Sequence, residues 1–326
     1  MRSIKGVVIA AAACLLTASA CLAAGPPGWA YGFPPGPATA AAAAPAPAAN
    51  PAAADTTPKH LPGNSMEFTR AQIANGFGPA DWYPGDHPQM PDVVAHGKRP
   101  EVRACSLCHY PNGKGRAENA GVAGLPNAYF IQQMMDFRSG DRKSAEPRKA
   151  NTNAMIAIAK GMTEDEIKQA ADYFGSMKWT PWIKVVESKT APKTRIQGGL
   201  FLALEGDAKE PLGQRIIEVP VNAEATEVLR DPHSGFIAYA PVGSLKKGEA
   251  LVKSKQCAVC HGTDLKGLGP VPGIAGRSPS YLMRQMYDMQ QGARKGLWSG
   301  LMKPVVANLS EEDLLALSAY AAAQTP

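Results

Sequence analysis

The sequence contains few cysteines, and each of them lies either in the N-terminal stretch or in one of two short motifs. Six cysteines occur in 326 residues, and two of them, Cys14 and Cys21, lie in an apolar N-terminal stretch. The other four belong to two copies of one short motif. If the N-terminal stretch is removed, no cysteine is left for a disulfide bond or for a catalytic nucleophile.

Long apolar runs and strong charge are missing as well. Beyond the N-terminal stretch, no segment approaches the roughly 18 continuous apolar residues of a membrane-spanning helix, so we expect the remainder to be soluble. The formal net charge of +6 is a small basic excess, part of which lies in the N-terminal stretch. Such a charge is no evidence for nucleic acid as a partner.

The two cysteine motifs are Cys105-Ser-Leu-Cys108-His109 and Cys257-Ala-Val-Cys260-His261. C-x-x-C-H is the attachment signal for c-type haem, in which both sulfurs bond to the porphyrin and the histidine becomes the proximal iron ligand. A thiol redox pair and half of a zinc site are the alternatives. The two pairs lie too far apart for a zinc ribbon, and both carry the histidine. We therefore predict two covalently attached haem c groups as cofactors.

The motifs belong to an internal repeat. The offset that carries Cys105 onto Cys257 also carries Tyr129 onto Tyr281 and Gln133 onto Gln285. Helical stripes and a capping box recur in each copy, the boxes opening at Thr163 and Ser310, and Ser278-Pro279 marks a helix start in the second copy. Two copies of one helical fold are the economical interpretation.

The second iron ligand in each copy is predicted to be methionine. Met155 and Met302 lie at matched places, in a loop before the last capped helix of each copy. A thioether ligand raises the reduction potential and suits electron transfer. Met134 and Met286 lie on helical stripes, where methionine usually fills the core, so we expect these two to line the haem pockets.

Two arginines follow a glycine in the loop that leaves each haem-lining helix. Arg142 and Arg294 are candidates for pairing with haem propionates, and a solvated loop charge is the alternative. Tyr129, Tyr281 and Trp298 are similar candidates.

The N-terminal stretch has the features of a secretory signal peptide, with basic Arg2 and Lys5 before an apolar core. Cleavage near residue 24 and a periplasmic location are expected, which agrees with haem attachment outside the bacterial cytoplasmic membrane. A lipid anchor at Cys21 and an uncleaved membrane anchor are alternatives. Peripheral association with a membrane therefore stays open.

The composition divides the remaining chain into four parts. Residues 25–62 are rich in alanine and proline and are expected to form a disordered tether. Residues 63–180 are the first haem domain with an irregular N-terminal extension, and residues 244–326 are the second. Short β-prone runs between them, in 181–243, indicate a small β element or a long linker.

The repeat resembles the two-domain, di-haem class I cytochromes c, the group called c-four. The resemblance rests on the two motifs, on Pro272-Gly-Ile-Ala-Gly276-Arg, on Tyr281-x-x-x-Gln285-Met286 and on Met302. It implies a mainly α fold of two tandem cytochrome c domains, here joined by a small β-rich insert. It also implies that the Pro272 carbonyl accepts a hydrogen bond from His261. Ala120 replaces proline in the first copy, so we expect a weaker bond to His109.

The function implied is single-electron transfer in the periplasm between redox partner proteins. The donor is a dehydrogenase or a quinol-oxidising complex, and the acceptor a terminal oxidase. No small-molecule substrate and no enzyme activity are expected. Two alternatives stay open: a fixed cytochrome subunit of a membrane-associated dehydrogenase, and a di-haem peroxidase. The peroxidase needs an open iron position, and paired methionine ligands argue against one.

Overall fold

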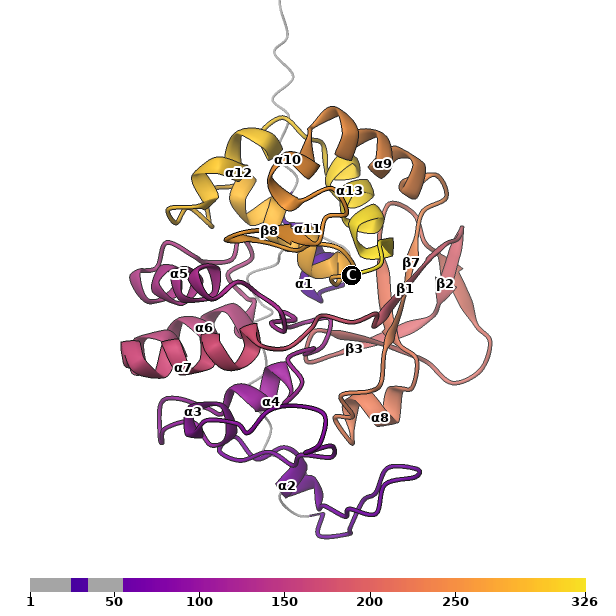
Figure 1. Ribbon diagram of the computed structural model, residues 1–326. Helices are drawn as coiled ribbons and strands as arrows, with labels where there is room; N and C mark the ends of the chain where they lie inside the picture. The colour runs from indigo at the N-terminus through magenta and orange to yellow at the C-terminus, as the bar shows by residue number, and fades with distance from the viewer. Residues whose placement is uncertain (1–24, 35–54) are drawn as a thin grey trace, which may run out of the picture.

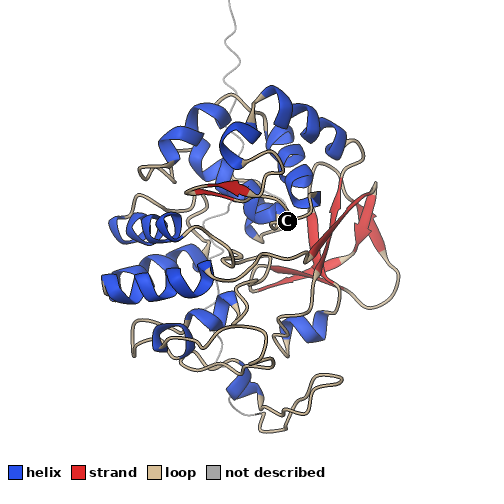
Figure 2. Ribbon diagram, viewed as in Figure 1, coloured by secondary structure: helices blue, strands red, loops and turns tan. Residues whose placement is uncertain are grey.

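The computed structural model describes residues 25–34 and 55–326 of the chain. Two groups of helices lie one above the other, with a β region along one side of both (Figure 1; Figure 2). The predicted signal peptide and the central part of the predicted tether lie outside the described residues.

The helices of the first domain and its extension lie below those of the second domain in Figure 1. They are α2 (Arg70–Ile73), α3 (Asp92–Ala95), α4 (Cys105–His109), α5 (Asn127–Ser139), α6 (Ala150–Gly161) and α7 (Glu164–Gly175). The second domain has α9 (Ser244–Ser254), α10 (Cys257–His261), α11 (Pro279–Gln290), α12 (Ser299–Val306) and α13 (Glu311–Ala323), with a hairpin of β8 (Gly267–Leu268) and β9 (Val271–Pro272).

The predicted helix starts are present. Thr163 and Ser310 each accept a hydrogen bond from the third backbone N–H of the helix, and the acidic side chain three residues on bonds back to the cap. Ser278 caps α11, with proline at the first helical position. These contacts satisfy donors that a helix start otherwise leaves unpaired. Local sequence thus determines where the helices begin.

The β region packs against both domains. Its sheet has the order β1-β7-β6, in which β1 (Ile183–Glu187) runs parallel to β7 (Phe236–Ala240) and β6 (Ile217–Pro220) antiparallel to it. Two separate two-stranded sheets accompany it, β2 (Thr190–Pro192) with β5 (Lys209–Pro211) and β3 (Thr194–Gln197) with β4 (Leu200–Ala203), and α8 (Ala223–Glu227) follows β6. The region is therefore folded rather than a loose linker.

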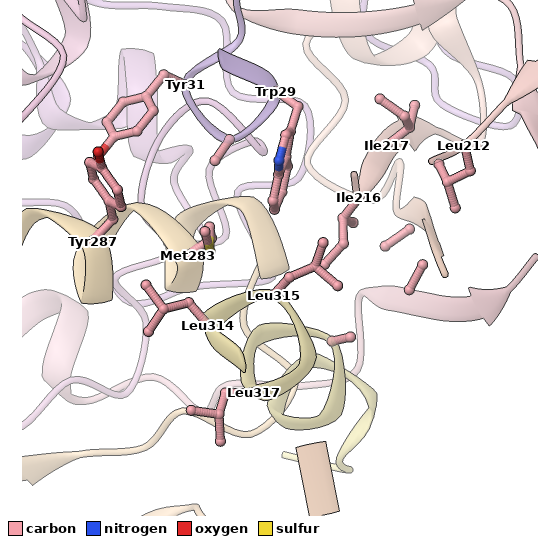
Figure 3. Close-up of a cluster of buried hydrophobic side chains, with 14 of the residues drawn as sticks. Trp29, Tyr31, Leu212, Ile216, Ile217, Met283, Tyr287, Leu314, Leu315 and Leu317 are labelled. Carbon is pink, nitrogen blue, oxygen red and sulfur yellow. The ribbon is translucent and has the colours of Figure 1, made fainter. Parts of the chain in front are cut away.

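The predicted disordered tether is wrong at its first end. Residues 28–31 form the short helix α1 (Gly28–Tyr31), and Trp29, Ala30 and Tyr31 are at most 5% exposed. They pack in one cluster with Met283, Tyr287 and leucines of α13 (Figure 3). Two aromatic side chains bury enough apolar surface to offset the conformational entropy lost when this short segment is ordered.

The other end of the predicted tether is folded too. Lys59 pairs with Phe68 in a short β-bridge, and Leu61 is 2% exposed in a cluster with Ile73 and Trp82. The extension that runs from here to residue 104 therefore belongs to the folded protein.

The crossing of α9 and α13 depends on a glycine. A Cβ atom at Gly248 would lie 2.2 Å from the Ala316 carbonyl oxygen and 2.5 Å from Cβ of Tyr320. Only glycine lets the two helices approach so closely, and this contact supports the helix that leads into the second attachment motif.

We expect Gly248→Ala to destabilise the protein, because the added methyl group forces backbone atoms of α13 away. The expected loss is about 1–3 kcal/mol in the free energy of unfolding, as for other overpacked sites, measured by chemical denaturation. Gly85→Ala is the control, since a Cβ atom added there would have no neighbour within 4 Å. Equal stability of both variants would contradict the packing argument.

Candidate functional site

The first motif lies at the wall of a large cavity. Its five residues form α4, and a cavity of about 370 Å³ opens beside it. Six of the residues around the cavity are Cys105, Cys108, His109, Met134, Met155 and Phe174. The structure therefore brings together all four residues predicted to hold the first haem.

Both proximal histidines are set by a backbone carbonyl. His109 Nδ1 lies 2.8 Å from the Ala120 oxygen, and His261 Nδ1 lies 2.9 Å from the Pro272 oxygen. A carbonyl oxygen can only accept, so Nδ1 carries the proton and Nε2 keeps its lone pair for a metal. Burial lowers the pKa of both histidines, which favours the neutral ring. The hydrogen bond to His109 is therefore not weakened as expected, because its acceptor is a backbone carbonyl, which is present whether the residue is proline or alanine.

The predicted distal methionines lie in helices, not in loops. Met155 belongs to α6 and Met302 to α12, and both are partly buried against the core of their domain. Met155 lines the first cavity together with Met134. The prediction of a loop at Met155 is wrong because residues 150–161 form the helix α6, which packs apolar side chains against α5.

The second motif, α10, has the same internal arrangement but a more open setting. Gln256 precedes it with a φ of 54°, and His261 is 8% exposed. Cys257 packs with Tyr281 against Leu265 and Leu282, whereas Cys260 is exposed. Met302 packs with Met286 against a different cluster, the one around Met283 and α13. These contacts therefore place the four predicted residues in one domain but do not join Met302 to His261.

Sequence reasoning missed the charged end of the first cavity. Lys149 and Arg284 line it, and both are at most 5% exposed. The Lys149 ammonium donates to the Tyr31 carbonyl at 3.2 Å, and burial lowers the pKa of Lys149 to about 7. Arg284 donates to the Ala30 and Ala117 carbonyls at 2.6 and 3.0 Å. No local pattern signals these residues, because their partners are distant in the sequence.

Arg142 and Arg294 are neither solvated nor confined to their own domains. They are 8% and 7% exposed, and backbone bonds join their loops in an antiparallel bridge. Arg142 donates to Gln285 at 2.8 Å and Tyr281 at 3.3 Å. Arg294 reciprocates with 2.8 Å bonds to Gln133 and Tyr129. We call these six side chains, which are Arg142, Arg294, Gln133, Gln285, Tyr129 and Tyr281, the reciprocal network.

The reciprocal network also brings Trp298 across the interface. Its ring stacks on Tyr129 of the first domain, with centroids 6.2 Å apart. Arg142 and Tyr281 line the first cavity at the same time. The three aromatic candidates from the sequence thus hold the domains together, and Tyr281 among them reaches the cavity.

The first cavity fits a covalently attached haem. Two thiols on one turn can bond to the edge of the ring, and a neutral histidine offers Nε2 to iron. Apolar side chains such as Phe130 and Val122 suit the porphyrin, and buried Lys149 and Arg142 suit anionic propionates. Among the described residues, the buried Lys149 ammonium has no carboxylate at ion-pair distance.

We predict that Arg294→Met destabilises the contact between the domains. The change removes three charged hydrogen bonds, two of which cross between the domains, and leaves the oxygen atoms of Tyr129 and Gln133 buried with fewer donors, at a cost of about 2–3 kcal/mol. Denaturant unfolding checks the loss. Lys295→Met is the matched control, since this side chain is 64% exposed and lies 4.0 Å from Asp141. If the control loses as much stability, the network does not hold the domains.

Within residues 25–34 and 55–326, no helix is both long and apolar enough to cross a membrane.

Comparison with known proteins agrees with this site. The family described as "Cytochrome C oxidase, cbb3-type, subunit III" matches residues 243–320. Cytochrome c-554(548) of Halomonas halodenitrificans is 41% identical over 69 residues, which cover 21% of this chain and 83% of that protein.

Two relatives match a longer part of the chain. The thiosulfate dehydrogenase electron acceptor of Thiomonas intermedia is 25% identical over 69% of this chain and 80% of its own length. Cytochrome c4 of Azotobacter vinelandii is 24% identical over 68% and 84%. The crystal structure of Pseudomonas stutzeri cytochrome c4 aligns with 21% identity and a TM-score of 0.43, over 68% of this chain and 93% of that one.

The attachment motifs and these relatives together settle the cofactor, which is covalently bound haem c at the two cysteine pairs. The chain belongs to the class I c-type cytochromes and is similar to cytochrome c4.

Proposed function

We propose that this protein is a periplasmic di-haem electron carrier built from two tandem class I cytochrome c domains, residues 63–180 and 244–326. The β-rich segment 181–243 joins them. The donor is a dehydrogenase or a quinol-oxidising complex, and the acceptor a terminal oxidase. The proposal rests on one observation: Nδ1 of each histidine donates a hydrogen bond to a backbone carbonyl, which leaves the lone pair of Nε2 available for iron.

The ligand assignment follows the domains. Cys105, Cys108, His109 and Met155 hold the first haem, and Cys257, Cys260, His261 and Met302 hold the second. The support for Met155 is its place in the wall of the first cavity. The support for Met302 is its position in α12, which precedes the last capped helix just as α6 does.

The chain's own contribution is to hold the histidines, exclude water and keep the domains together. When bound, haem c supplies a one-electron iron couple. The carbonyls of Ala120 and Pro272 orient the imidazoles and raise their strength as ligands. Phe137, Phe174 and Ile167 fill the core around the first cavity and keep its surroundings apolar. The reciprocal network fixes one haem site relative to the other.

A fixed cytochrome subunit of a dehydrogenase is the second candidate. A relative named as the electron acceptor of thiosulfate dehydrogenase supports a dehydrogenase of that kind as donor. A fixed subunit should remain with its dehydrogenase on the native membrane through gentle extraction and size-exclusion chromatography. A free carrier should be released by osmotic shock alone, and that is the result we expect.

We predict two covalent haems per mature chain, because all four cysteines of the described residues lie in attachment motifs. Intact mass and haem staining after denaturing electrophoresis measure the number. Cys257→Ala with Cys260→Ala should leave one haem, and the same change at Cys105 and Cys108 should leave the other. A wild-type mass with fewer than two haems after correct maturation would sink the proposal.

Met302→Ala should remove the methionine sulfur that binds one iron, while His261 and the two cysteine–haem bonds of that domain remain. The variant should keep two haems, lose about half of the weak red absorption of sulfur bound to ferric haem, and show a lower potential at one haem. Met155→Ala should do the same at the other haem. Spectroelectrochemical titration measures both effects.

Met134→Ala and Met286→Ala are the matched controls for these variants. Both side chains lie in the same domains as the proposed ligands, in helices α5 and α11. They should keep the full sulfur band and mainly lose stability, by about 2–5 kcal/mol where the side chain is fully buried. Loss of the band in a control, or its survival in Met302→Ala, would show that the ligand is another residue. Enzyme-like turnover of peroxide by the wild type would favour a peroxidase.

A further inference from the structure

The two attachment motifs match in sequence but differ in what lies over them. In the first, the two residues between the cysteines are buried, with Ser106 2% and Leu107 8% exposed. In the second, Ala258 is exposed and Val259 is 70% exposed. Because the comparison is between equivalent positions of one chain, the difference comes from the surrounding protein.

Two segments cover the first motif. Ser106 donates to the Val94 carbonyl of α3 at 2.8 Å, and the backbone N–H of Ala104 donates to Gly76 at 2.9 Å. From the other side, Arg230 donates to the Leu107 carbonyl, and Asn112 donates to the Pro232 carbonyl at 3.2 Å. The extension 57–104 and the loop 228–234 thus close over α4. We call these two segments the cover.

The two halves of the cover are fastened to each other. The Trp82 indole donates to the Leu229 carbonyl at 2.7 Å, and both side chains are buried with Leu61 and Ile73. The rings of Tyr83 and His233 stack with centroids 3.8 Å apart. The cover is therefore a packed layer of protein and not a loose loop.

The second motif has no comparable layer among the described residues. Helix α10 contacts α9 and the β8–β9 hairpin of its own domain. The hairpin carries Leu268, which is 60% exposed. We call Ala258, Val259 and Leu268, with the exposed lysines that stand next to the motif, to the hairpin and to Met302 in the sequence, the open face.

The open face is basic. Lys255 precedes the motif, Lys266 precedes the hairpin and Lys303 follows Met302; all three are exposed and make no ion pair within the described residues. Asp264 is the only exposed acidic residue between 253 and 308, a stretch that the structure describes throughout. An apolar centre with a lysine rim complements a partner whose redox edge has an acidic rim.

One residue connects the two haem sites internally. Tyr281 packs in the cluster that contains Cys257, and it also lines the first cavity. Its hydroxyl accepts a hydrogen bond from Arg142 of the first domain at 3.3 Å. Tyr281 therefore links the surroundings of the second motif to the wall of the first cavity, through a hydrogen bond that crosses between the domains.

We propose that redox partners dock on the open face, so that the second haem is the port for electrons and the first haem exchanges them through the second. The partner is a one-electron redox protein with an acidic rim. The reduced donor loses one electron, the second haem gains it and passes it to the first, and an oxidised acceptor removes it by the same port. This inference rests on the proposed electron-transfer function. Tunnelling falls off steeply with distance, so the cover disfavours exchange at the first motif.

The first test locates a bound anion on the oxidised holoprotein. Hexacyanochromate(III) is a redox-inert, paramagnetic probe that broadens proton resonances close to it. Haem methyl resonances are assigned to each haem by comparison with Met302→Ala. We expect the methyl groups of the second haem to broaden at lower reagent concentrations than those of the first. Equal broadening, or earlier broadening of the first haem, would overturn the proposal.

The second test measures the rate of exchange. Lys255→Glu, Lys266→Glu and Lys303→Glu are combined, and the reduced protein is oxidised by hexacyanoferrate(III) in a stopped-flow instrument. We expect the rate to fall on the order of tenfold at low ionic strength and the difference to shrink at high salt. The control combines Lys168→Glu, Lys178→Glu and Lys184→Glu, which are exposed lysines far from the open face in sequence.

An equal fall in the control would show that only net charge matters, and would overturn the proposed port. Failure of the proposed function gives a different result, because a wild type without redox-active haems would not be oxidised by the reagent at all. The weak red absorption of sulfur bound to ferric haem shows whether the lysine-to-glutamate variants still use Met302, the residue before Lys303, as an iron ligand.

Discussion

The reciprocal network between the two domains governs how the rest of the protein is arranged. Helices α5 and α11 each offer a tyrosine and a glutamine to the arginine of the other domain, so both buried arginines receive hydrogen-bond partners through the same exchange. A buried guanidinium left without partners is costly, so the two domains favour the arrangement that pairs both. The interface is thus specific, and it sets where the two attachment motifs lie.

Segments outside the repeat strengthen this arrangement. Tyr31 donates to Asp288 of α11 at 2.7 Å, while Lys149 and Arg284 bind carbonyls of the same N-terminal helix α1. Close approach is needed as well, because Gly32 has a φ of 78° and no room for a Cβ against Gly199. The β region adds Glu218, whose carboxylate accepts from Ser278 at 2.8 Å. Burial raises the pKa of Glu218. Additions to the repeat have thus become part of its core.

The same additions make two similar haem sites unequal. The extension and the loop 228–234 bury the two residues between the cysteines of the first motif, whereas the equivalent residues of the second are exposed and have exposed lysines near them in the sequence. Burial and solvent access are means by which a protein tunes a haem, and they also decide which edge a partner reaches. A repeat can therefore supply two cofactor sites while later segments give each of them a separate role.

The features that depend on neighbouring residues could be predicted from the sequence. These are the C-x-x-C-H turns, the capping boxes at Thr163 and Ser310, and the β-rich character of residues 181–243. The helical setting of Met155, the burial of Trp29, the role of Lys149 and the partners of Arg142 and Arg294 could not. Only the folded protein decides these features. The partners of Lys149, Arg142 and Arg294 lie more than a hundred residues away in the sequence, so no local pattern reveals their contacts.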